Sequence, residues 1–378
     1  MRVNGSAPDP EGRCSAHGPL VGVRVVEMAG LGPVPMAALL LAEMGADVVR
    51  VDRPQPPAFP DTLDRGRRSV TIDLKRQEGT ELVLRLAERA NILIEGFRPG
   101  VMERLGLGPE QVHARNAGLV YGRMTGWGQT GPRAARAGHD INYIALTGAL
   151  SAIGRAGGPP QVPLNLVGDF GGGALYLVAG VLAALHHARI TGEGQVVDAA
   201  IVDGVTHLAA MIWAERRYRG WTDERGTNLL DSGAPFYDVY RTSDGEWFAV
   251  GAIEPQFYAQ LARLLGLPEW ASRQDEREHW PGMREAFARA FAARTRAEWE
   301  EIFADSDACA APVLSWAEAI EDPHMRARGT HLRLDDGDVP APAPRFSRTP
   351  SQVARPGGPT DDSSRAVLED WEIHGPST

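Results

Sequence analysis

Two short glycine-rich segments carry an imidazole and a carboxyl group that together suit proton transfer at carbon. Residues 138–143 present His139 with Asp140 directly after it, and residues 168–173 place Asp169 ahead of three glycines and an apolar stretch. Histidine exchanges a proton near neutral pH because its ordinary pKa is about 6.5. We therefore predict that His139 and Asp169 are the two bases of a proton transfer at a carbon atom.

Each of these residues also has a purely structural explanation. A histidine before an aspartate is ordinary in folded proteins, and aspartate is a preferred N-cap at the start of a helix. Three consecutive glycines, however, each cost about 1 kcal/mol relative to alanine in a helix, and capping alone does not require them. We therefore expect residues 171–173 to let a bulky ligand lie against the helix start, where free N–H groups stabilise a developing oxyanion.

Two carboxylates raise questions that the sequence leaves open. The start of a helix lowers the pKa of a carboxyl group, whereas a proton donor such as Asp169 needs its pKa raised, so burial or the substrate must supply an opposing effect. Glu254 lies between an expected strand and Pro255. It is either a solvated or capping residue or a carboxylate that orients the imidazole.

Six basic residues occur in the N-terminal half of the chain, mostly after expected strands. Surface exposure explains any one of them, but several at strand ends of an acidic protein indicate a phosphate-rich ligand at that edge of the sheet. These residues are Arg53, Arg67, Arg68, Lys75, Arg98 and Arg104.

The composition is that of a globular protein that does not bind polyanions in general. Of the 378 residues, 43% are apolar and 23% are charged, and the formal net charge is −10, which disfavours nucleic acid and anionic membranes as partners. Cys14 and Cys309 form no disulfide or metal-binding pattern, so we expect a cytoplasmic location and no metal. The longest apolar run, residues 174–185, is shorter than the about 20 residues that span a bilayer.

Short β-branched stretches alternate with amphipathic ones in the first half of the chain, which indicates an open α/β sheet with parallel strands. We expect strands at residues 23–28, 47–52, 69–74, 91–95 and 119–124. We expect helices at residues 36–44, 78–89, near residue 109 and, most strongly, at 170–189.

A second, smaller α/β domain is expected after a change to charged and polar residues. Its expected strands are residues 246–252 and 311–315, and its expected helices lie near residues 256–265, 283–293 and 296–303. The predicted organisation is a disordered tail over residues 1–18, a large domain over 19–215 and 340–378, a linker over 216–227, a small domain over 228–325 and a return linker over 326–339.

Three familiar nucleotide and metal motifs are absent from the sequence. Residues 30–35, Gly-Leu-Gly-Pro-Val-Pro, have a proline where the dinucleotide-binding fingerprint has its third glycine, which argues against a nicotinamide oxidoreductase. Neither a phosphate-binding G-x-x-x-x-G-K-[ST] loop nor a zinc-binding H-E-x-x-H occurs.

The order of several motifs resembles one family, the alpha-methylacyl-CoA racemases within the family III CoA-transferase group. The resemblance runs from about Leu20 to Arg348 and is carried by the motifs together rather than by any one of them. Besides the two opening segments, the motifs are Gly45-Ala46-Asp47-Val48-Val49-Arg50-Val51-Asp52, Asp73-Leu74-Lys75, Glu95-Gly96-Phe97-Arg98-Pro99-Gly100, Thr125-Gly126-Trp127-Gly128-Gln129 and Gly251-Ala252-Ile253-Glu254-Pro255-Gln256.

This resemblance implies a Rossmann-like large domain with a parallel sheet, a smaller α/β domain, and two chains interlocked as a homodimer. It implies an acyl-CoA thioester substrate without a separate cofactor, with His139 and Asp169 as the base–acid pair. Glu254 would support the histidine, within its own chain or from the partner chain. The CoA contacts would fall on Arg53, Ile72, Asp73, Leu74, Lys75, Gly96, Phe97, Arg98 and Arg104, and on the backbones of Gly138, Asp140, Ile141, Asn142, Tyr143, Gly168, Phe170, Gly171, Gly172 and Gly173.

Two other functions remain open on the same residues. A CoA-transferase of this fold needs a carboxylate nucleophile, for which Asp140 is the candidate, but it does not need the imidazole of His139 beside it. A protein that only binds CoA would tolerate the loss of His139. We favour interconversion of the two configurations at C2 of a 2-methyl-branched acyl-CoA, by a two-base proton transfer through an enolate.

Overall fold

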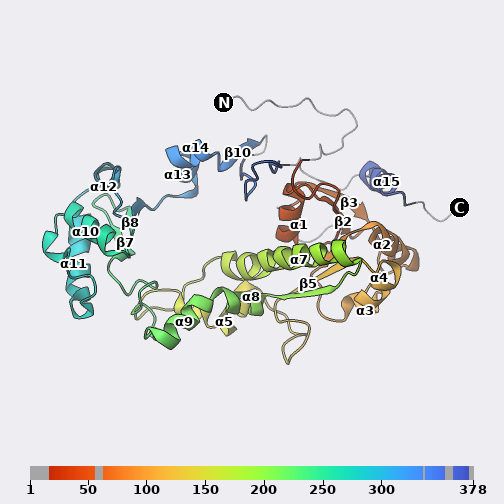
Figure 1. Cartoon of the computed structure of the whole chain (residues 1–378), viewed down its shortest axis with the longest axis horizontal. Helices are drawn as coiled ribbons and strands as arrows, with labels where there is room; N and C mark the ends of the chain where they lie inside the picture. The colour runs from red at the N-terminus through yellow and green to blue at the C-terminus, as the bar shows by residue number, and fades with distance from the viewer. Residues whose placement is uncertain (1–16, 56–62, 335–336, 354–360, 374–378) are drawn as a thin grey trace. The chain divides into compact units, whose positions relative to one another are not determined.

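The chain folds into two compact units (Figure 1). The computed structural model describes residues 17–55, 63–334, 337–353 and 361–373, so the predicted tail over residues 1–18 lies outside the described residues except for its last two. Unit 1 comprises Met1–Thr147, Leu164–Leu208 and Val339–Thr378, and unit 2 comprises Gly148–Pro163 and Ala209–Asp338.

The segment Gly148–Pro163, which we expected in the large domain, belongs to unit 2. Two arginines tie it there. Arg155 pairs with Asp238, and Arg225 donates to the carbonyl oxygen of Ser151 over 2.7 Å. These interactions join residues that are far apart in the sequence, so no local sequence pattern predicts them.

A six-stranded parallel sheet forms the centre of unit 1, in the order β3-β2-β1-β4-β5-β6. The strands are β1 (Arg24–Met28), β2 (Asp47–Asp52), β3 (Arg67–Thr71), β4 (Ile92–Glu95), β5 (Val120–Thr125) and β6 (Val196–Ala200). The predicted parallel α/β sheet is confirmed, and β6 is an addition. β6 lies at the edge of the sheet and starts with partly exposed residues, so it lacks the continuous apolar run of a central strand.

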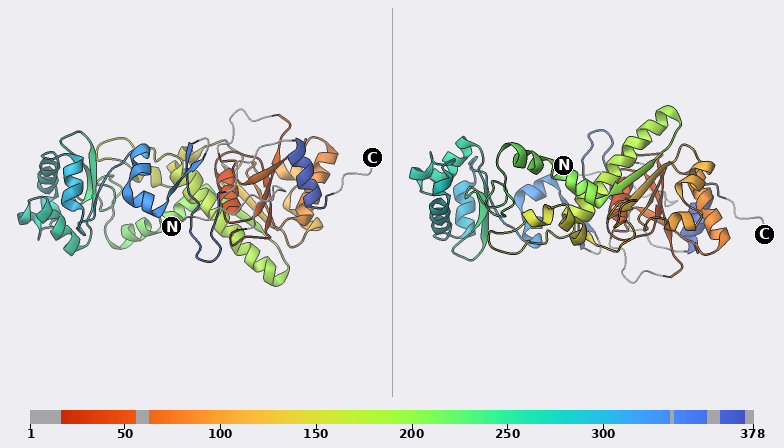
Figure 2. Two further views of the ribbon diagram at one scale, coloured as in Figure 1. Left: turned by 90° about the horizontal axis from the view of Figure 1, so that it is seen from above. Right: turned by 90° about the horizontal axis from the view of Figure 1, so that it is seen from below.

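Helices cover both faces of this sheet (Figures 1 and 2). α2 (Gln77–Arg89), α4 (Pro109–Arg115) and α15 (Asp361–Asp370) lie on one face, and α1 (Pro33–Glu43) and α7 (Leu175–Thr191) lie on the other. Unit 1 also contains α3 (Val101–Arg104), α5 (Asp140–Leu146) and α8 (Ile201–Leu208). Because both faces are buried, the central strands need apolar side chains on both sides, which explains their strong sequence signal.

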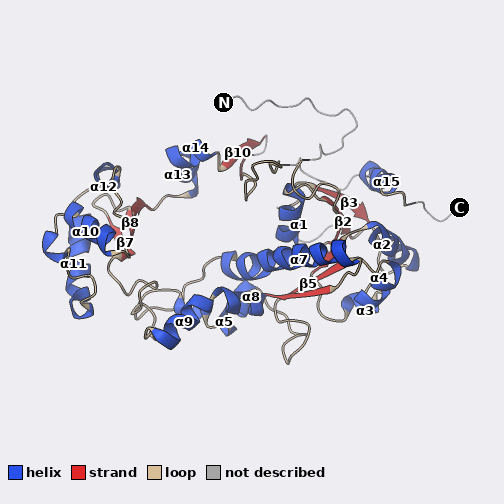
Figure 3. Ribbon diagram, in the orientation of Figure 1, coloured by secondary structure: helices blue, strands red, loops and turns tan. Residues whose placement is uncertain are grey.

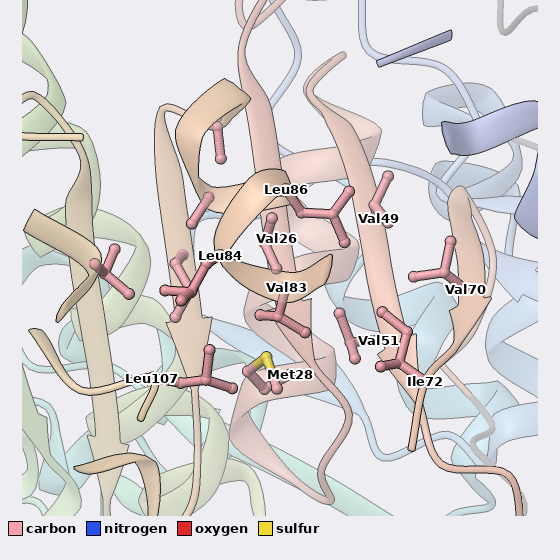
Figure 4. Packing of buried hydrophobic residues seen from close by; sticks show 14 of the residues in the cluster. Val26, Met28, Val49, Val51, Val70, Ile72, Val83, Leu84, Leu86 and Leu107 are labelled. Carbon is pink, nitrogen blue, oxygen red and sulfur yellow. The ribbon is translucent and has the colours of Figure 1, made fainter. Parts of the chain in front are cut away.

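The core beneath α2 is built from alternate residues of neighbouring strands, whose side chains point toward the helix (Figure 4). All of them are almost fully removed from solvent. The residues are Val26, Met28, Val49, Val51 and Val70 from the strands and Val83 and Leu86 from α2.

The carboxyl ends of the strands form the edge at which a sheet of this topology binds ligands, at the point where the strand order reverses between β1 and β4. Arg53 follows β2, residues 72–75 follow β3, and residues 96–98 follow β4. The segments predicted to bind CoA therefore share one edge of the sheet.

The strongest predicted helix begins earlier and ends later than expected. A π-helical segment, η1 (Leu166–Ala174), runs directly into α7 and so makes one helix from Leu166 to Thr191. Within the described residues this is the one helix that is long and apolar enough to cross a membrane, with a mean hydropathy of 1.6, and 39% of its apolar window is buried in the chain. The helix is thus longer than the apolar run 174–185 on which the argument against a membrane span was based, and the absence of a membrane partner stays a prediction.

Unit 2 is built on an antiparallel sheet in the order β7-β8-β9, of which Figure 3 labels β7 and β8. Its strands are β7 (Tyr237–Arg241), β8 (Trp247–Gly251) and β9 (Ala310–Pro312), of which β7 was not predicted. Its helices are α6 (Ala149–Ala152), α9 (Ala210–Tyr218), α10 (Pro255–Leu264), α11 (Trp280–Phe291), α12 (Arg296–Phe303), α13 (Trp316–Glu321) and α14 (Pro323–Arg328), with short 3₁₀ turns at Pro268–Trp270 and Arg277–His279. Stacked aromatic rings, such as Tyr240 on Phe291, fill its core.

The predicted return linker over residues 326–339 has secondary structure of its own. It contains the end of α14 and a two-stranded sheet of β10 (His331–Leu334) and β11 (Gly337–Pro340). Its strands have only four residues each, so they carry too short a pattern from which to predict them.

Candidate active site

His139 is the N-cap residue of α5, with an extended backbone at φ −132° and ψ 174°. Its backbone N–H donates to Oδ1 of Asn142 over 3.1 Å, and its carbonyl oxygen accepts the N–H of Asn142 over 2.8 Å. The side chain is exposed. The capping interactions therefore fix the backbone and leave the imidazole able to meet a substrate.

The segment before His139 is held by the ring of Tyr143. A Cβ atom on Gly126 would lie 2.0 Å from this ring, and one on Gly138 would lie 2.7 Å from it. Trp127 packs edge-on against the same ring at 4.7 Å, and the Tyr143 hydroxyl donates to the carbonyl oxygen of Gly138. The glycines at 126 and 138 are thus explained by the space that the ring of Tyr143 needs.

Asp169 lies inside the first turn of η1 and is not the N-cap that the sequence suggested. The first N–H groups of a helix have no acceptor within that helix. The N–H of Asp169 is one of these, and it donates to Oδ2 of Asp140 over 2.7 Å. This N–H group is therefore already occupied. It is not free to stabilise an oxyanion, contrary to our expectation for the helix start.

The three glycines after Phe170 are explained by helix packing. A Cβ atom on Gly172 would lie 2.5 Å from Val205 of α8, and one on Gly204 of α8 would lie 1.9 Å from the carbonyl oxygen of Gly172. Gly173 is buried between Ile201 and α1. The interpretation that these glycines admit a ligand was wrong for Gly172 and Gly173, because they let η1 and α8 approach closely.

The pKa of Asp169 is raised from 3.8 to about 6. Burial is the main cause, and the negative charge of Asp140 adds to it. The charge of His139 and a hydrogen bond with Asn165 act in the opposite direction. Near neutral pH this carboxyl group therefore holds a proton part of the time, as a group that both gives and takes a proton must.

The start of α1 also lies beside Asp169, since a Cβ atom on Gly32 would be 3.1 Å from its Oδ2. Gly32 is the N-cap residue of α1, and prolines occupy the first and third helical positions, at 33 and 35. Proline has no N–H group, so this helix start offers fewer donors to a carboxylate than a typical one. The two prolines thus limit the stabilisation of the ionised form of Asp169.

Asp140 connects the two predicted bases, because it follows His139 in the chain and accepts the N–H of Asp169. His139 is also close enough for its charge to lower the pKa of Asp169. Glu254 belongs to unit 2, where it is the exposed N-cap residue of α10 and makes no capping hydrogen bond with its side chain. Its carboxylate is thus available to a partner outside its own helix.

Several residues predicted to bind CoA are in mutual contact. The guanidinium of Arg53 lies 5.9 Å from the ring centre of Phe97. Arg98 is close enough to lower the pKa of Tyr143, which burial and Asp169 raise. Arg104 ends α3 and approaches Gly100.

The segment after β3 is ordered differently, by contacts within its own backbone and side chains. Lys75 donates its backbone N–H to Asp73 over 3.0 Å, while Ile72 is buried in the core. Leu74 packs against the same core. The side chain of Lys75 thus extends from a segment that the core holds in place.

Two of the six basic residues are structural. Arg67 is buried and forms an ion pair with Glu27 at 2.8 Å, and Arg68 bonds with Asp47 and Asp370. Both lie on β3 itself and not beyond its end. The sequence around a single strand does not distinguish arginines on the strand from basic residues that follow its carboxyl end.

Two supporting residues were not singled out from the sequence. Glu95, at the end of β4, is buried and accepts the backbone N–H of Phe97 over 2.7 Å and the Nε–H of Arg123 over 3.1 Å. Burial raises its pKa to about 7. Asn165 forms a side-chain hydrogen bond with Asp169. Within the described residues there is no group of three histidine, cysteine or acidic side chains that could hold a metal ion.

Comparison with known proteins identifies relatives over nearly the whole chain. The model of CoA-transferase family III matches residues 20–363. Alpha-methylacyl-CoA racemase of Homo sapiens is 47% identical over 334 residues, which cover 88% of this chain and 87% of that protein. The racemase of Mus musculus is 48% identical with the same coverage. Succinyl-CoA–D-citramalate CoA-transferase of Chloroflexus aurantiacus is 32% identical and covers 93% of this chain and 94% of its own length.

Solved structures share the fold. A CaiB/BaiF family protein from Brucella suis superimposes with a TM-score of 0.79 at 26% identity, covering 94% of this chain and 100% of its own. The protein Rv3272 from Mycobacterium tuberculosis gives a TM-score of 0.79 at 28% identity with the same coverage.

Proposed function

The chain belongs to CoA-transferase family III, and we propose that it is an alpha-methylacyl-CoA racemase, which interconverts the (2R) and (2S) forms of 2-methylacyl-CoA thioesters. The identity with two mammalian racemases over 88% of the chain supports this reaction. The observation in the site that carries the proposal is the carboxyl group of Asp169, which is close enough to His139 to feel its charge and whose pKa is raised to about 6.

In the proposed reaction the thioester carbonyl acidifies the proton at C2. Neutral His139 takes this proton from one face and leaves a planar enolate, and protonated Asp169 gives a proton to the other face. For the opposite enantiomer the ionised Asp169 takes the proton and protonated His139 gives one. Each positioned proton transfer contributes about 10²–10⁴-fold to the rate.

The enolate oxygen needs hydrogen-bond donors other than the N–H of Asp169, which Asp140 occupies. The N–H groups of Asp140 and Ile141 are the first two of α5, so they have no acceptor inside the helix. They follow His139 directly in the chain. We assign the stabilisation of the enolate to these two groups.

The CoA moiety is assigned to the carboxyl edge of the sheet. Arg53, Lys75, Arg98 and Arg104 would bind its phosphates as charge-assisted donors, and Phe97 offers a flat apolar surface beside Arg53. Arg67 is left out of this set because it is buried in an ion pair. Arg68 is left out because it is paired with carboxylates. A cytoplasmic location agrees with the small number of cysteines and remains part of the proposal.

We propose an interlocked homodimer and place Glu254 as the carboxylate that supports His139, within one chain or across the dimer. The exposed apolar side chains of the long helix support an interface, since Leu166, Leu175 and Ile190 are 53%, 53% and 71% exposed. Light scattering after gel filtration tests the assembly, and a monomer at working concentrations would contradict it.

The rival CoA-transferase reaction is weakened by the position of its candidate nucleophile. Asp140 is only 7% exposed, and its Oδ2 accepts the N–H of Asp169. Attack on a thioester would require this carboxylate to leave its buried position. We therefore do not assign Asp140 the role of a nucleophile.

Incubation of the protein with a 2-methylacyl-CoA in heavy water tests the proposal. A racemase incorporates deuterium at C2 and converts a single enantiomer into a mixture without any acceptor. A CoA-transferase instead shows CoA exchange that depends on an added carboxylate acceptor. Acceptor-dependent exchange without deuterium at C2 would refute the racemase assignment.

A further inference from the structure

A buried carboxylate without a cationic partner contacts the backbone of the predicted acid. Asp140 Oδ2 accepts the backbone N–H of Asp169, while its Oδ1 is buried and has no hydrogen-bond partner. Within the described residues no arginine, lysine or histidine forms an ion pair with it. A buried carboxylate in this state is costly, so its position calls for a reason.

We propose that Asp140 is a positioning residue for Asp169: its buried carboxylate holds the Asp169 backbone and places a negative charge beside the Asp169 carboxyl group. This deepens the proposed racemase function and depends on it for its catalytic meaning. The contact itself is independent of that function.

The first part of the argument is geometric. The N–H of Asp169 belongs to the first turn of η1, where a helix leaves its donors without acceptors. Asp140 caps this turn from a different helix, α5, 29 residues earlier in the chain. A Cβ atom on Gly168 would lie 2.3 Å from Oδ2 of Asp140, so residue 168 must be glycine for the carboxylate to reach this N–H.

The second part of the argument is electrostatic. A carboxylate near the start of a helix is normally stabilised in its ionised form by free N–H groups. Asp140 occupies one of these N–H groups and adds a like charge nearby. Both effects favour the protonated form of Asp169, and the charge of Asp140 is the second cause, after burial, of the raised pKa of Asp169.

The other titratable groups around η1 do not account for the raised pKa of Asp169. On α5, His139 acts in the opposite direction on the pKa of Asp169, and Tyr143 is neutral near pH 7. The residues of α8 that meet η1 carry no charge, while the titratable residues Asp203 and His207 of α8 are exposed. The uncharged residues are Ile201, Gly204, Val205 and Leu208.

The remaining charged or titratable neighbours of η1 either have partners already or lie far from Asp169. In α1 the only acidic residue is Glu43, which pairs with Arg65 at the far end of the helix. On α7, Tyr176 bonds with His207, and His186, His187 and Arg189 lie near the distant end of the helix. On β5 Arg123 pairs with Glu95 and Glu103, and on β6 Asp198 accepts the N–H of Gln129. Asp140 is thus the acidic group that acts on Asp169 directly.

The test removes the charge of Asp140 while keeping an oxygen acceptor. In Asp140→Asn the amide oxygen can still accept the Asp169 N–H, whereas Asp140→Ala removes both. The carboxyl carbon of Asp169 is titrated by ¹³C NMR in protein labelled at aspartate, with Asp169→Asn used to assign its signal. Asp203→Asn, which removes an exposed carboxylate of α8, serves as the control.

The pKa of Asp169 is expected to fall from about 6 to a value between 3.8 and 6 in Asp140→Asn, because burial remains. It should stay unchanged in Asp203→Asn. The acid limb of the pH profile of kcat/KM should move to lower pH in Asp140→Asn, and equally for both enantiomers. Asp140→Ala should show the same shift with a further loss of kcat, because the Asp169 N–H then lacks its acceptor.

An unchanged titration of Asp169 in folded Asp140→Asn would overturn the proposal. If this variant does not fold, as judged by thermal melting, Asp140→Ser provides a second neutral side chain, and failure of both to fold would show a structural role instead. The NMR titration needs no substrate. A wild-type protein that fails to exchange the C2 proton would refute the racemase function but would leave the result of the NMR titration unaffected. Failure of the proposed function and failure of the proposed role of Asp140 are therefore distinguishable.

Discussion

Replacing His139 by alanine isolates Asp169 as a single base and predicts exchange from one enantiomer only. In His139→Ala, Asp169 can still remove the C2 proton from the enantiomer that faces it and return a deuteron to the same face. The other enantiomer loses its base and should exchange about 10²–10⁴-fold more slowly. Racemisation should be lost from both, because no acid remains on the opposite face.

The pH dependence of the remaining exchange follows from the pKa of Asp169. With a pKa of about 6, roughly 10% of this group is ionised at pH 5 and roughly 90% at pH 7, so exchange should rise roughly ninefold over this interval. The charge of His139 lowers the pKa of Asp169 in the intact protein. Its loss should therefore place the midpoint at or above 6, and not below it.

The assay measures deuterium uptake into each pure enantiomer by mass spectrometry, with chiral separation of the products. His324→Ala, which removes an exposed histidine of α14 in unit 2, is the control and should behave like the wild type. Asp169→Asn should reverse the preference between the enantiomers. Equal loss of exchange from both enantiomers in His139→Ala would refute the assignment of one base to each face.

Further predictions concern substitutions of Gly204, Glu95 and Glu254. Gly204→Ala should destabilise the protein by about 1–3 kcal/mol or more, because its Cβ atom would lie 1.9 Å from the Gly172 carbonyl oxygen; calorimetry should show no comparable loss in Gly158→Ala, whose Cβ meets only an ordinary contact at 3.5 Å. Glu95→Gln should raise KM for acyl-CoA more than it lowers kcat, since Glu95 orders the N–H of Phe97, and an unchanged KM would exclude this role. The pKa of Glu95 in the folded protein is raised to about 7 from 4.5. The wild type should therefore lose stability relative to Glu95→Gln as the pH rises from 4.5 to 7. A difference in melting temperature that is constant with pH would contradict the burial of this charge. Glu254→Gln should reduce kcat with little change in KM if Glu254 supports His139, and a change in KM alone would argue against that role.

The parts of the fold that the sequence predicted well are those with local signals. The central strands of unit 1 are buried on both faces and read as apolar runs, and β2 begins and ends where its pattern indicated. β6 and β7 were missed because their residues alternate in exposure or lie at an edge. The start of η1 was missed because Pro163 and the polar residues before Leu166 resemble a loop, and a π-helical turn has no recognisable sequence pattern.

The site was predictable only as far as residue types could show. His139 and Asp169 were named from their chemistry, and both lie in unit 1, where they are electrostatically coupled. The reason given for the glycines after Phe170 was wrong for Gly172, because Gly172 packs against α8, which only the folded chain brings close. The contact between Asp140 and the Asp169 N–H spans 29 residues and has no local signature.

The environment of Asp169 favours acid–base chemistry over nucleophilic attack for a reason that concerns its two protonation states. A nucleophile needs only the ionised form, and an ordinary aspartate with a pKa of 3.8 supplies it fully at neutral pH. A two-base reaction needs the same group as an acid in one direction and as a base in the other, so both forms must be populated. Burial and the charge of Asp140 raise the pKa of Asp169 toward this condition, while His139 and the hydrogen bond with Asn165 lower it. A pKa of about 6 is the balance of these opposing effects, and it keeps the two forms within about tenfold of each other from pH 5 to 7.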